Sequence, residues 1–163
     1  MEPLTKRTPH IPLGCPEENP STLTTHDIRG DVVWDQLGIA KGTLATGEWA
    51  VKLDSPGMYS FKFRRWPREL GMPINYSMSK EEKGKLAPWG PFLKSDIKVD
   101  HSQFTTARLK IFGQEYTIKV DGNEEFAEIE LGFSNNGETM LEAYFYNEAG
   151  GKCAPYYLEV EKL

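Results

Sequence analysis

The sequence predicts an all-β protein, an antiparallel β-sandwich of about eight or nine strands with one long loop insertion. Apolar side chains recur at every second position in short segments, which is the period of a strand with one buried face. Turn-forming residues separate these segments at intervals of roughly 8–12 residues. No segment carries the pattern of a long helix, so the sequence lacks the crossover helices that a parallel α/β sheet needs.

The clearest pair of strands occupies residues 47–53 and 59–64, on either side of the turn sequence Ser55-Pro56-Gly57. We expect a half-buried antiparallel hairpin here, which ends at Pro67 because proline has no N–H to donate to a neighbouring strand. Alternate residues of both strands form its inner face: Trp49, Val51, Leu53, Tyr59, Phe61 and Phe63.

The other predicted strands lie towards the two ends of the chain. After a tail at residues 1–9, a short strand at 11–13 and a β-prone segment at 22–28 are expected, with Leu23 facing inward. In the C-terminal half, turns are predicted at Gly113-Gln114, Asp121-Gly122, Asn135-Asn136-Gly137 and residues 148–151. The strands between them cover residues 107–111, 116–120, 126–131, 141–145 and 156–160.

Residues 68–103 show only weak alternation, and we expect them to form the long loop insertion of a single domain that spans residues 10–163. Within the insertion, Ser79 and Glu82 fit a capping box, which predicts a short helix over residues 80–86. Asn75-Tyr76-Ser77 matches the glycosylation sequon, a weak pattern that matters only in a secreting eukaryote.

The amino-acid composition and net charge limit the classes of molecule that the protein is expected to bind. The 163 residues include 19 basic and 24 acidic side chains, and the net charge of −5 argues against nucleic acid as the main partner. No run approaches the roughly 18 apolar residues of a membrane-spanning helix, and residues 1–12 lack the apolar segment of a signal peptide. Cys15 and Cys153 lie near opposite ends of the chain, so they are either thiols or, in an exported protein, a disulfide that ties the termini together.

The sequence offers little catalytic chemistry, and no metal or other cofactor is predicted. His10, His26 and His101 are widely spaced, without a metal-binding pattern. His26-Asp27 is the one adjacent pair suited to acid–base work, and a structural role in a turn is favoured for it because neighbouring strand residues point to opposite faces. A pair of glycosidase carboxylates is spatial rather than sequential, so a small glycoside-acting enzyme stays open.

Aromatic residues beside arginines provide the candidate ligand-binding residues. Trp89 lies between Pro88 and Gly90 in the insertion, where an exposed ring could stack on a sugar. Trp66 ends the second central strand, and Arg64 and Arg65 before it could hold a sulfate or carboxylate group. The alternatives are packing for both tryptophans and cross-strand pairing with a glutamate for the arginines.

Short motifs along most of the chain resemble the C-terminal region of bacterial arylsulfatase-like enzymes. The resemblance covers residues 10–163 without the insertion. Its motifs are Ile11-Pro12-Leu13-Gly14, Asn19-Pro20, residues 23–27, Trp34-Asp35-Gln36, residues 47–51, Gly57-Met58-Tyr59, residues 64–69, residues 107–111, Gly113-Gln114-Glu115 and residues 155–163.

The resemblance implies an accessory domain without a catalytic centre. Sulfatases carry a Cys- or Ser-x-Pro-x-Arg nucleophile and acidic calcium ligands, and Cys15-Pro16-Glu17-Glu18-Asn19 does not fit that nucleophile motif. The implied function is a non-catalytic β-sandwich that packs on, or helps to target, a sulfatase-type catalytic domain and contacts sulfated carbohydrate. The implied location is periplasmic or secreted.

Two other functions stay open beside this one: an independent carbohydrate-binding module that uses Trp89, Trp66 and Arg65, and the small glycoside-acting enzyme. The oligomeric state is open as well, since an exposed edge strand could support a dimer.

Overall fold

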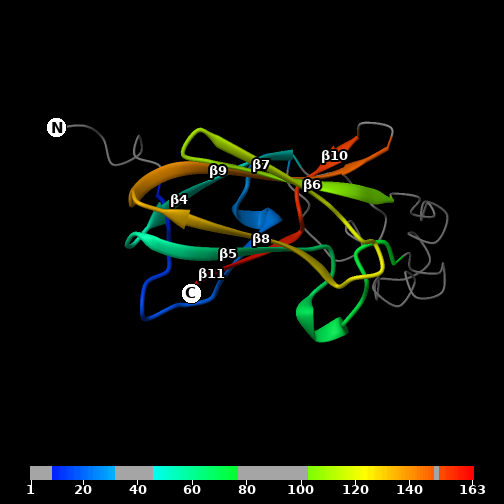
Figure 1. Cartoon of the computed structure of the whole chain (residues 1–163), viewed down its shortest axis with the longest axis horizontal. Coiled ribbons are helices and arrows are strands. Elements are labelled where there is room, and N and C mark those ends of the chain that lie inside the picture. Colours follow the sequence, from blue (N-terminus) through cyan, green and yellow to red (C-terminus); the bar gives the residue numbers. More distant parts are fainter. Residues whose placement is uncertain (1–8, 32–45, 77–102, 149–150) are drawn as a thin grey trace, which may run out of the picture.

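The computed structural model describes residues 9–31, 46–76, 103–148 and 151–163. In this part of the chain two β-sheets, of seven and four strands, stack face to face (Figure 1). The prediction of an all-β sandwich is therefore confirmed. Trp34, Ser79, the expected helix at residues 80–86, Trp89 and His101 lie outside the described residues.

The seven-stranded sheet has the order β1-β4-β9-β6-β7, with β3 beside β4 and β10 beside β9. Only β1 and β4 run parallel; the other pairs are antiparallel. Its strands are β1 (Ile11–Leu13), β3 (Arg29–Asp31), β4 (Thr46–Leu53), β6 (Phe104–Ile111), β7 (Gln114–Lys119), β9 (Gly137–Asn147) and β10 (Lys152–Cys153).

The four-stranded sheet has the order β2-β11-β5-β8 and is antiparallel throughout. Its strands are β2 (Ser21–Thr24), β5 (Gly57–Arg64), β8 (Phe126–Phe133) and β11 (Tyr157–Lys162). The described residues thus hold eleven strands, more than the eight or nine expected. The two strands that were not expected are β3 and β10, with three and two residues.

The core lies between the two sheets and includes the predicted inward-facing residues of the two central strands. Trp49, Val51 and Leu53 are fully buried, as are Tyr59, Phe61 and Phe63. The rings interdigitate across the gap, since the centroid of Phe63 on β5 lies 5.7 Å from that of Phe145 on β9 in an edge-to-face contact.

The predicted hairpin of the two central strands is wrong. β4 pairs with β1, β3 and β9 in one sheet, while β5 pairs with β8 and β11 in the other. Ser55-Pro56-Gly57 therefore carries the chain from one sheet to the other. Both strands still bury the expected face, because a strand with one apolar face is equally satisfied by a partner sheet across the core.

The other predicted turns differ in whether they join two strands of one sheet or strands of different sheets. Phe112 and Gly113 both have positive φ, 49° and 73°, and connect β6 to β7 in a tight hairpin with Ile111 opposite Gln114. Asp121-Gly122 and Asn135-Asn136-Gly137, by contrast, connect strands of different sheets. Two short 3-10 helices, η2 (Thr25–Asp27) and η3 (Arg68–Leu70), complete the described elements, and no helix among them is long and apolar enough to cross a membrane.

Candidate functional site

Arg64 is the last residue of β5 and lies on the outer side of the four-stranded sheet. In the strand register it is opposite Phe126 on one side and Tyr157 on the other. Its guanidinium lies 4.7 Å from the ring centroid of Phe126, and Nη1 is 3.6 Å from a carboxylate oxygen of Glu125. Arg64 thus pairs with a glutamate as expected, although Glu125 lies just before β8 and not directly opposite on the strand, and Arg64 is only 6% exposed.

Arg65 enters a different environment, at the end of the sandwich where β5 stops. It is 1% exposed, its guanidinium lies 4.8 Å from the Trp66 ring centroid, and Nη1 donates to the carbonyl oxygen of Tyr76 at 3.5 Å. Burial lowers the pKa of the Arg65 guanidinium, partly opposed by its interaction with Tyr156 and Cys153. Burial also raises the pKa of Tyr156, and Cys153 adds to that rise.

Trp66 packs in the core and does not provide a surface for stacking. Its side chain is 2% exposed, and its ring meets that of Tyr76 edge to face with the centroids 6.3 Å apart. The structure thus shows the packing alternative for Trp66. Because Arg64 and Arg65 are buried in separate environments, they do not form the joint anion-binding pair that their adjacency suggested.

The chain after Trp66 folds back and closes this end of the sandwich. Gly71 adopts the left-handed conformation after η3, with φ of 57°, a conformation that glycine adopts without the steric cost of a Cβ. Ile74 then inserts into the core with no exposed surface, and its N–H donates to the carbonyl oxygen of Glu124.

Asn75 straps the segment to the first residue of β6. Its Nδ2 donates to the carbonyl oxygen of Phe104 at 3.0 Å, and its Oδ1 accepts from the N–H of Phe104 at 2.8 Å. Gly122 packs so closely on this amide that a Cβ there would lie 1.9 Å from Nδ2. The amide of the sequon asparagine is thus engaged in holding two segments together.

A hollow of about 540 Å³ lies beside this strap, between residues 73–76, 103–105 and 120–123. Tyr76, Gln103, Thr105 and Asn123 give it polar groups, and Phe104 and Val120 give it apolar surface. No charged residue is among the described residues that line it. The chain leaves the hollow at Tyr76 and returns to it at Gln103, so both ends of the 77–102 segment, which includes Trp89, are attached here.

Two groups in the hollow are available to a ligand. The side-chain amides of Gln103 and Asn123 are exposed and make no hydrogen bond within the described part of the chain. The backbone N–H of Asn123 is used, since it donates to Asp121 Oδ1 at 3.0 Å and so fixes the loop. No sequence signal marked Gln103 or Asn123, because isolated amides become a site only when the fold brings them together.

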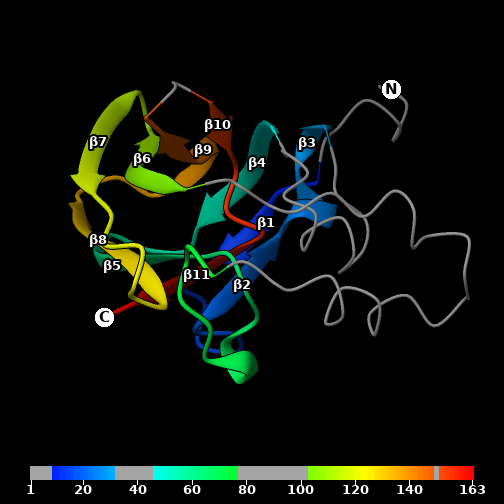
Figure 2. The same cartoon turned by 90° about the vertical axis from the view of Figure 1, so that its right-hand side faces the viewer.

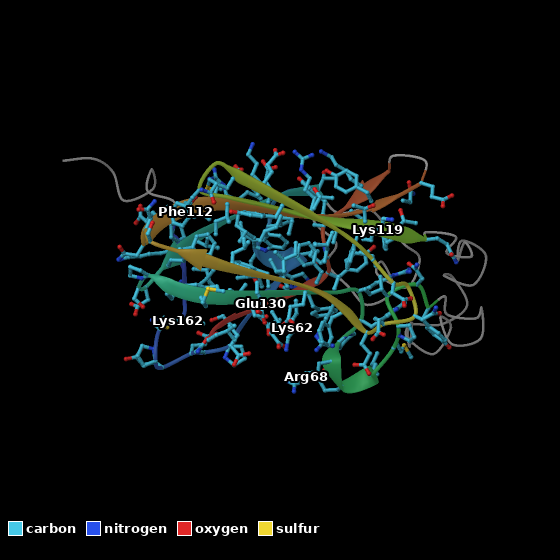
Figure 3. All side chains as sticks on the ribbon, in the orientation of Figure 1. Lys62, Arg68, Phe112, Lys119, Glu130 and Lys162 are labelled. Carbon is cyan, nitrogen blue, oxygen red and sulfur yellow. The ribbon has the colours of Figure 1, made fainter. Side chains whose placement is uncertain are left out.

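Carboxylates converge on the outer face of the four-stranded sheet. Lys62 Nζ lies 3.9 Å from Glu159 Oε1 and 4.0 Å from Glu128 Oε2, and Ser60 Oγ donates to the same Glu128 oxygen at 2.6 Å. Lys62 and Glu130 lie together on this outer side in Figure 3. The lysine neutralises part of the charge of the two nearer glutamates, and the group joins three neighbouring strands.

Asp27 of the His26-Asp27 pair has a structural role, as expected. Asp27 Oδ2 accepts from Thr24 N–H at 3.2 Å and from Thr24 Oγ1 at 3.1 Å, which caps η2. Cys15 and Cys153 are not joined in a disulfide. Within the described residues, no three His, Cys, Asp or Glu side chains gather into a group that could hold a metal ion.

Comparison of the chain with protein-family models, with curated proteins and with solved structures finds no match.

Proposed function

We propose that this chain is a non-catalytic β-sandwich domain that binds carbohydrate in the hollow at the end of the sandwich. The observation that carries the proposal is the lining of that hollow, in which two unused side-chain amides and a tyrosine surround apolar surface. Sugars present hydroxyl groups beside apolar C–H faces, and protein sites for such ligands combine aromatic surface with a few orienting polar groups.

The lining favours neutral over sulfated sugar. A sulfate group is normally met by arginine or lysine, and the described residues around the hollow include neither. The sulfate contact that the sequence suggested for Arg64 and Arg65 would require exposed guanidiniums, whereas these side chains are 6% and 1% exposed.

The accessory role beside a sulfatase-type catalytic domain is part of this proposal and rests on the sequence resemblance alone. The non-catalytic character is supported by the use of Asp27 as a helix cap and by the ion pairs of Glu128 and Glu159 with Lys62. Turnover of a chromogenic glycoside or sulfate ester that is abolished by Glu128→Gln or Glu159→Gln would contradict it.

The test is calorimetric titration of the protein with a panel of neutral and sulfated polysaccharides. We expect saturable binding of a neutral polysaccharide. Gln103→Ala and Asn123→Ala should each weaken it about fivefold, as expected for one hydrogen bond worth about 1 kcal/mol. Asn135→Ala, an exposed asparagine in the turn after β8, is the matched control and should bind like the wild type.

Two results would overturn the proposal. If no polysaccharide of the panel binds, the proposed carbohydrate ligand is wrong. If a polysaccharide binds and neither Gln103→Ala nor Asn123→Ala changes its affinity, the binding site lies outside the hollow.

A further inference from the structure

β7 and β8 are the edge strands of the two sheets at one side of the sandwich, and their exposed edges carry different charges. Among the described residues, β7 pairs with β6 alone and β8 pairs with β5 alone, so each has an open edge. Figure 2 shows β7 and β8 on the same side of the molecule. An open edge carries unpaired N–H and C=O groups and is a template for another strand, unless charge or shape protects it.

The open edge of β8 is protected by charge. Its exposed positions include Glu128 and Glu130; Lys62 on β5 lies 4.0 Å from Glu128, and Glu130 has no ion pair within the described residues. An antiparallel second copy of β8 centred on Ile129 would bring Glu128 of one chain opposite Glu130 of the other. Like charges directly opposite destabilise a strand pair.

The charges along the open edge of β7, by contrast, favour pairing with a second copy of the same strand. Gln114–Lys119 has the sequence QEYTIK, with exposed Glu115, Thr117 and Lys119. Glu115 and Lys119 stand at equal distances on either side of Thr117. Pairing two copies antiparallel about Thr117 places Glu115 opposite Lys119, twice over.

The hydrogen-bonding groups of β7 agree with that register. In the tight hairpin, Ile111 is opposite Gln114, and residues flanking a two-residue turn form a hydrogen-bonded pair. Even-numbered residues of β7 therefore bond to β6, as the N–H of Val120 does to the carbonyl oxygen of Thr105 at 2.8 Å. Odd-numbered residues direct their N–H and C=O groups to the open edge. Thr117 can then pair with its own copy through two reciprocal hydrogen bonds.

Apolar side chains support the same arrangement on the inner side. Tyr116 and Ile118 are half-buried and pack against the core. The proposed register places Tyr116 of one copy opposite Ile118 of the other, and an aromatic ring beside a β-branched residue is a favourable cross-strand pair. Neighbouring registers lose the charge match: centring on Glu115 or on Lys119 brings like charges together.

We propose that the chain forms a two-fold symmetric homodimer through antiparallel pairing of the two β7 strands about Thr117. The interface is isologous, so each favourable pair occurs twice. Within one chain Glu115 pairs with Arg108 on β6, away from the open edge, so in the dimer its carboxylate is shared between Arg108 and Lys119 of the second copy. Phe112 and Lys119 mark the two ends of the edge in Figure 3.

Sedimentation of the full chain over a concentration series tests the dimer, and charge exchange tests its register. The wild type should show a reversible monomer–dimer equilibrium that weakens with added salt. Glu115→Lys places two lysines opposite each other and Lys119→Glu two glutamates, so each variant alone should raise the dimer dissociation constant at least tenfold. Mixing the two variants should restore dimers, because each then offers the charge that the other lacks.

Thr117→Pro tests the proposed dimer through its backbone hydrogen bonds, independently of charge. It removes an N–H that faces the open edge and leaves the β6 pairing intact, so the variant should fold and sediment as a monomer. Circular dichroism confirms folding. A wild type that is monomeric up to its solubility limit would overturn the proposal. So would a dimer that persists unchanged in Glu115→Lys, Lys119→Glu and Thr117→Pro, or a mixture of the charge variants that stays monomeric.

Discussion

Arg64 and Arg65 are neighbours in the sequence, and the fold gives them different environments. Arg64 lies on the outer side of the four-stranded sheet, over Phe126 and beside the half-exposed carboxylate of Glu125. Arg65 lies at the buried end of the sandwich among Trp66, Tyr156 and Cys153. Arg64 is buried against an aromatic ring, with one exposed carboxylate beside it, whereas Arg65 is buried at the end of the sandwich, where burial lowers the pKa of its guanidinium. One residue of displacement along a strand end thus exchanges one environment for the other.

The largest effect is expected at Arg65. Arg65→Ala should lower the free energy of unfolding by about 2–4 kcal/mol, because it leaves a cavity beside Trp66. Arg65→Met should recover more than half of that loss, since it restores volume and removes a buried charge. Urea denaturation measures both. The exposed Arg68→Ala is the control and should change stability by less than about 0.5 kcal/mol. If Arg65→Met is as unstable as Arg65→Ala, the charge itself supports the fold.

Alkaline pH tests the buried environment of Arg65 through its neighbour Tyr156. Burial raises the pKa of Tyr156 beside Arg65, and it also raises the pKa of Tyr59. Tyrosines of the unfolded chain ionise near pH 10, so above that pH the folded protein binds more protons than the unfolded one. Stability that is fully present below pH 10 is therefore lost as pH rises, by up to about 1.4 kcal/mol per pH unit for the deeply buried Tyr156.

Tyr156→Phe should make this alkaline loss shallower, as thermal melts between pH 8 and pH 11 would show. Tyr157→Phe, on the neighbouring half-buried residue, is the matched variant for comparison. An unchanged pH profile in Tyr156→Phe would mean that its hydroxyl is not held neutral by the fold.

A smaller effect is expected at Arg64. Arg64→Ala should lower the free energy of unfolding by about 1 kcal/mol, because it removes the cation–π contact with Phe126 and one ion pair. Urea denaturation beside Arg65→Ala makes the comparison direct. Equal losses at the two positions would contradict the difference in environment drawn from their neighbours.

The smallest effect is expected at Glu125. Its side chain is 50% exposed, and an exposed ion pair contributes little. Glu125→Gln should cost about 0.5 kcal/mol or less at low salt and nothing measurable at high salt. Glu124→Gln, next to it in sequence, is the control. A large, salt-independent loss in Glu125→Gln would show that the carboxylate anchors Arg64 more strongly than its exposure indicates.

The candidate site was predicted only in part. Two residues that the sequence singled out, Trp66 and Arg65, lie beside Tyr76, which lines the hollow proposed as the site. The sequence left packing and ligand contact both open for Trp66, because the amino acid alone does not show whether an indole ring will be covered, and the structure shows packing. Trp89 stays a prediction, as it lies outside the described residues.

The sequence by itself determined the fold class and the buried face of each longer strand, because alternation is a local property that any partner sheet satisfies. Leu23, Trp49, Phe61 and Ile129 are buried as their positions predicted. The tertiary structure alone decided which strands pair. Turn residues such as Asp121-Gly122 can reverse the chain within one sheet or carry it from one sheet to the other. Which of the two occurs depends on whether the next strand fills the core better beside its predecessor or in the opposite sheet. The hollow beside Asn75 has the same origin, since contacts between segments distant in sequence create it.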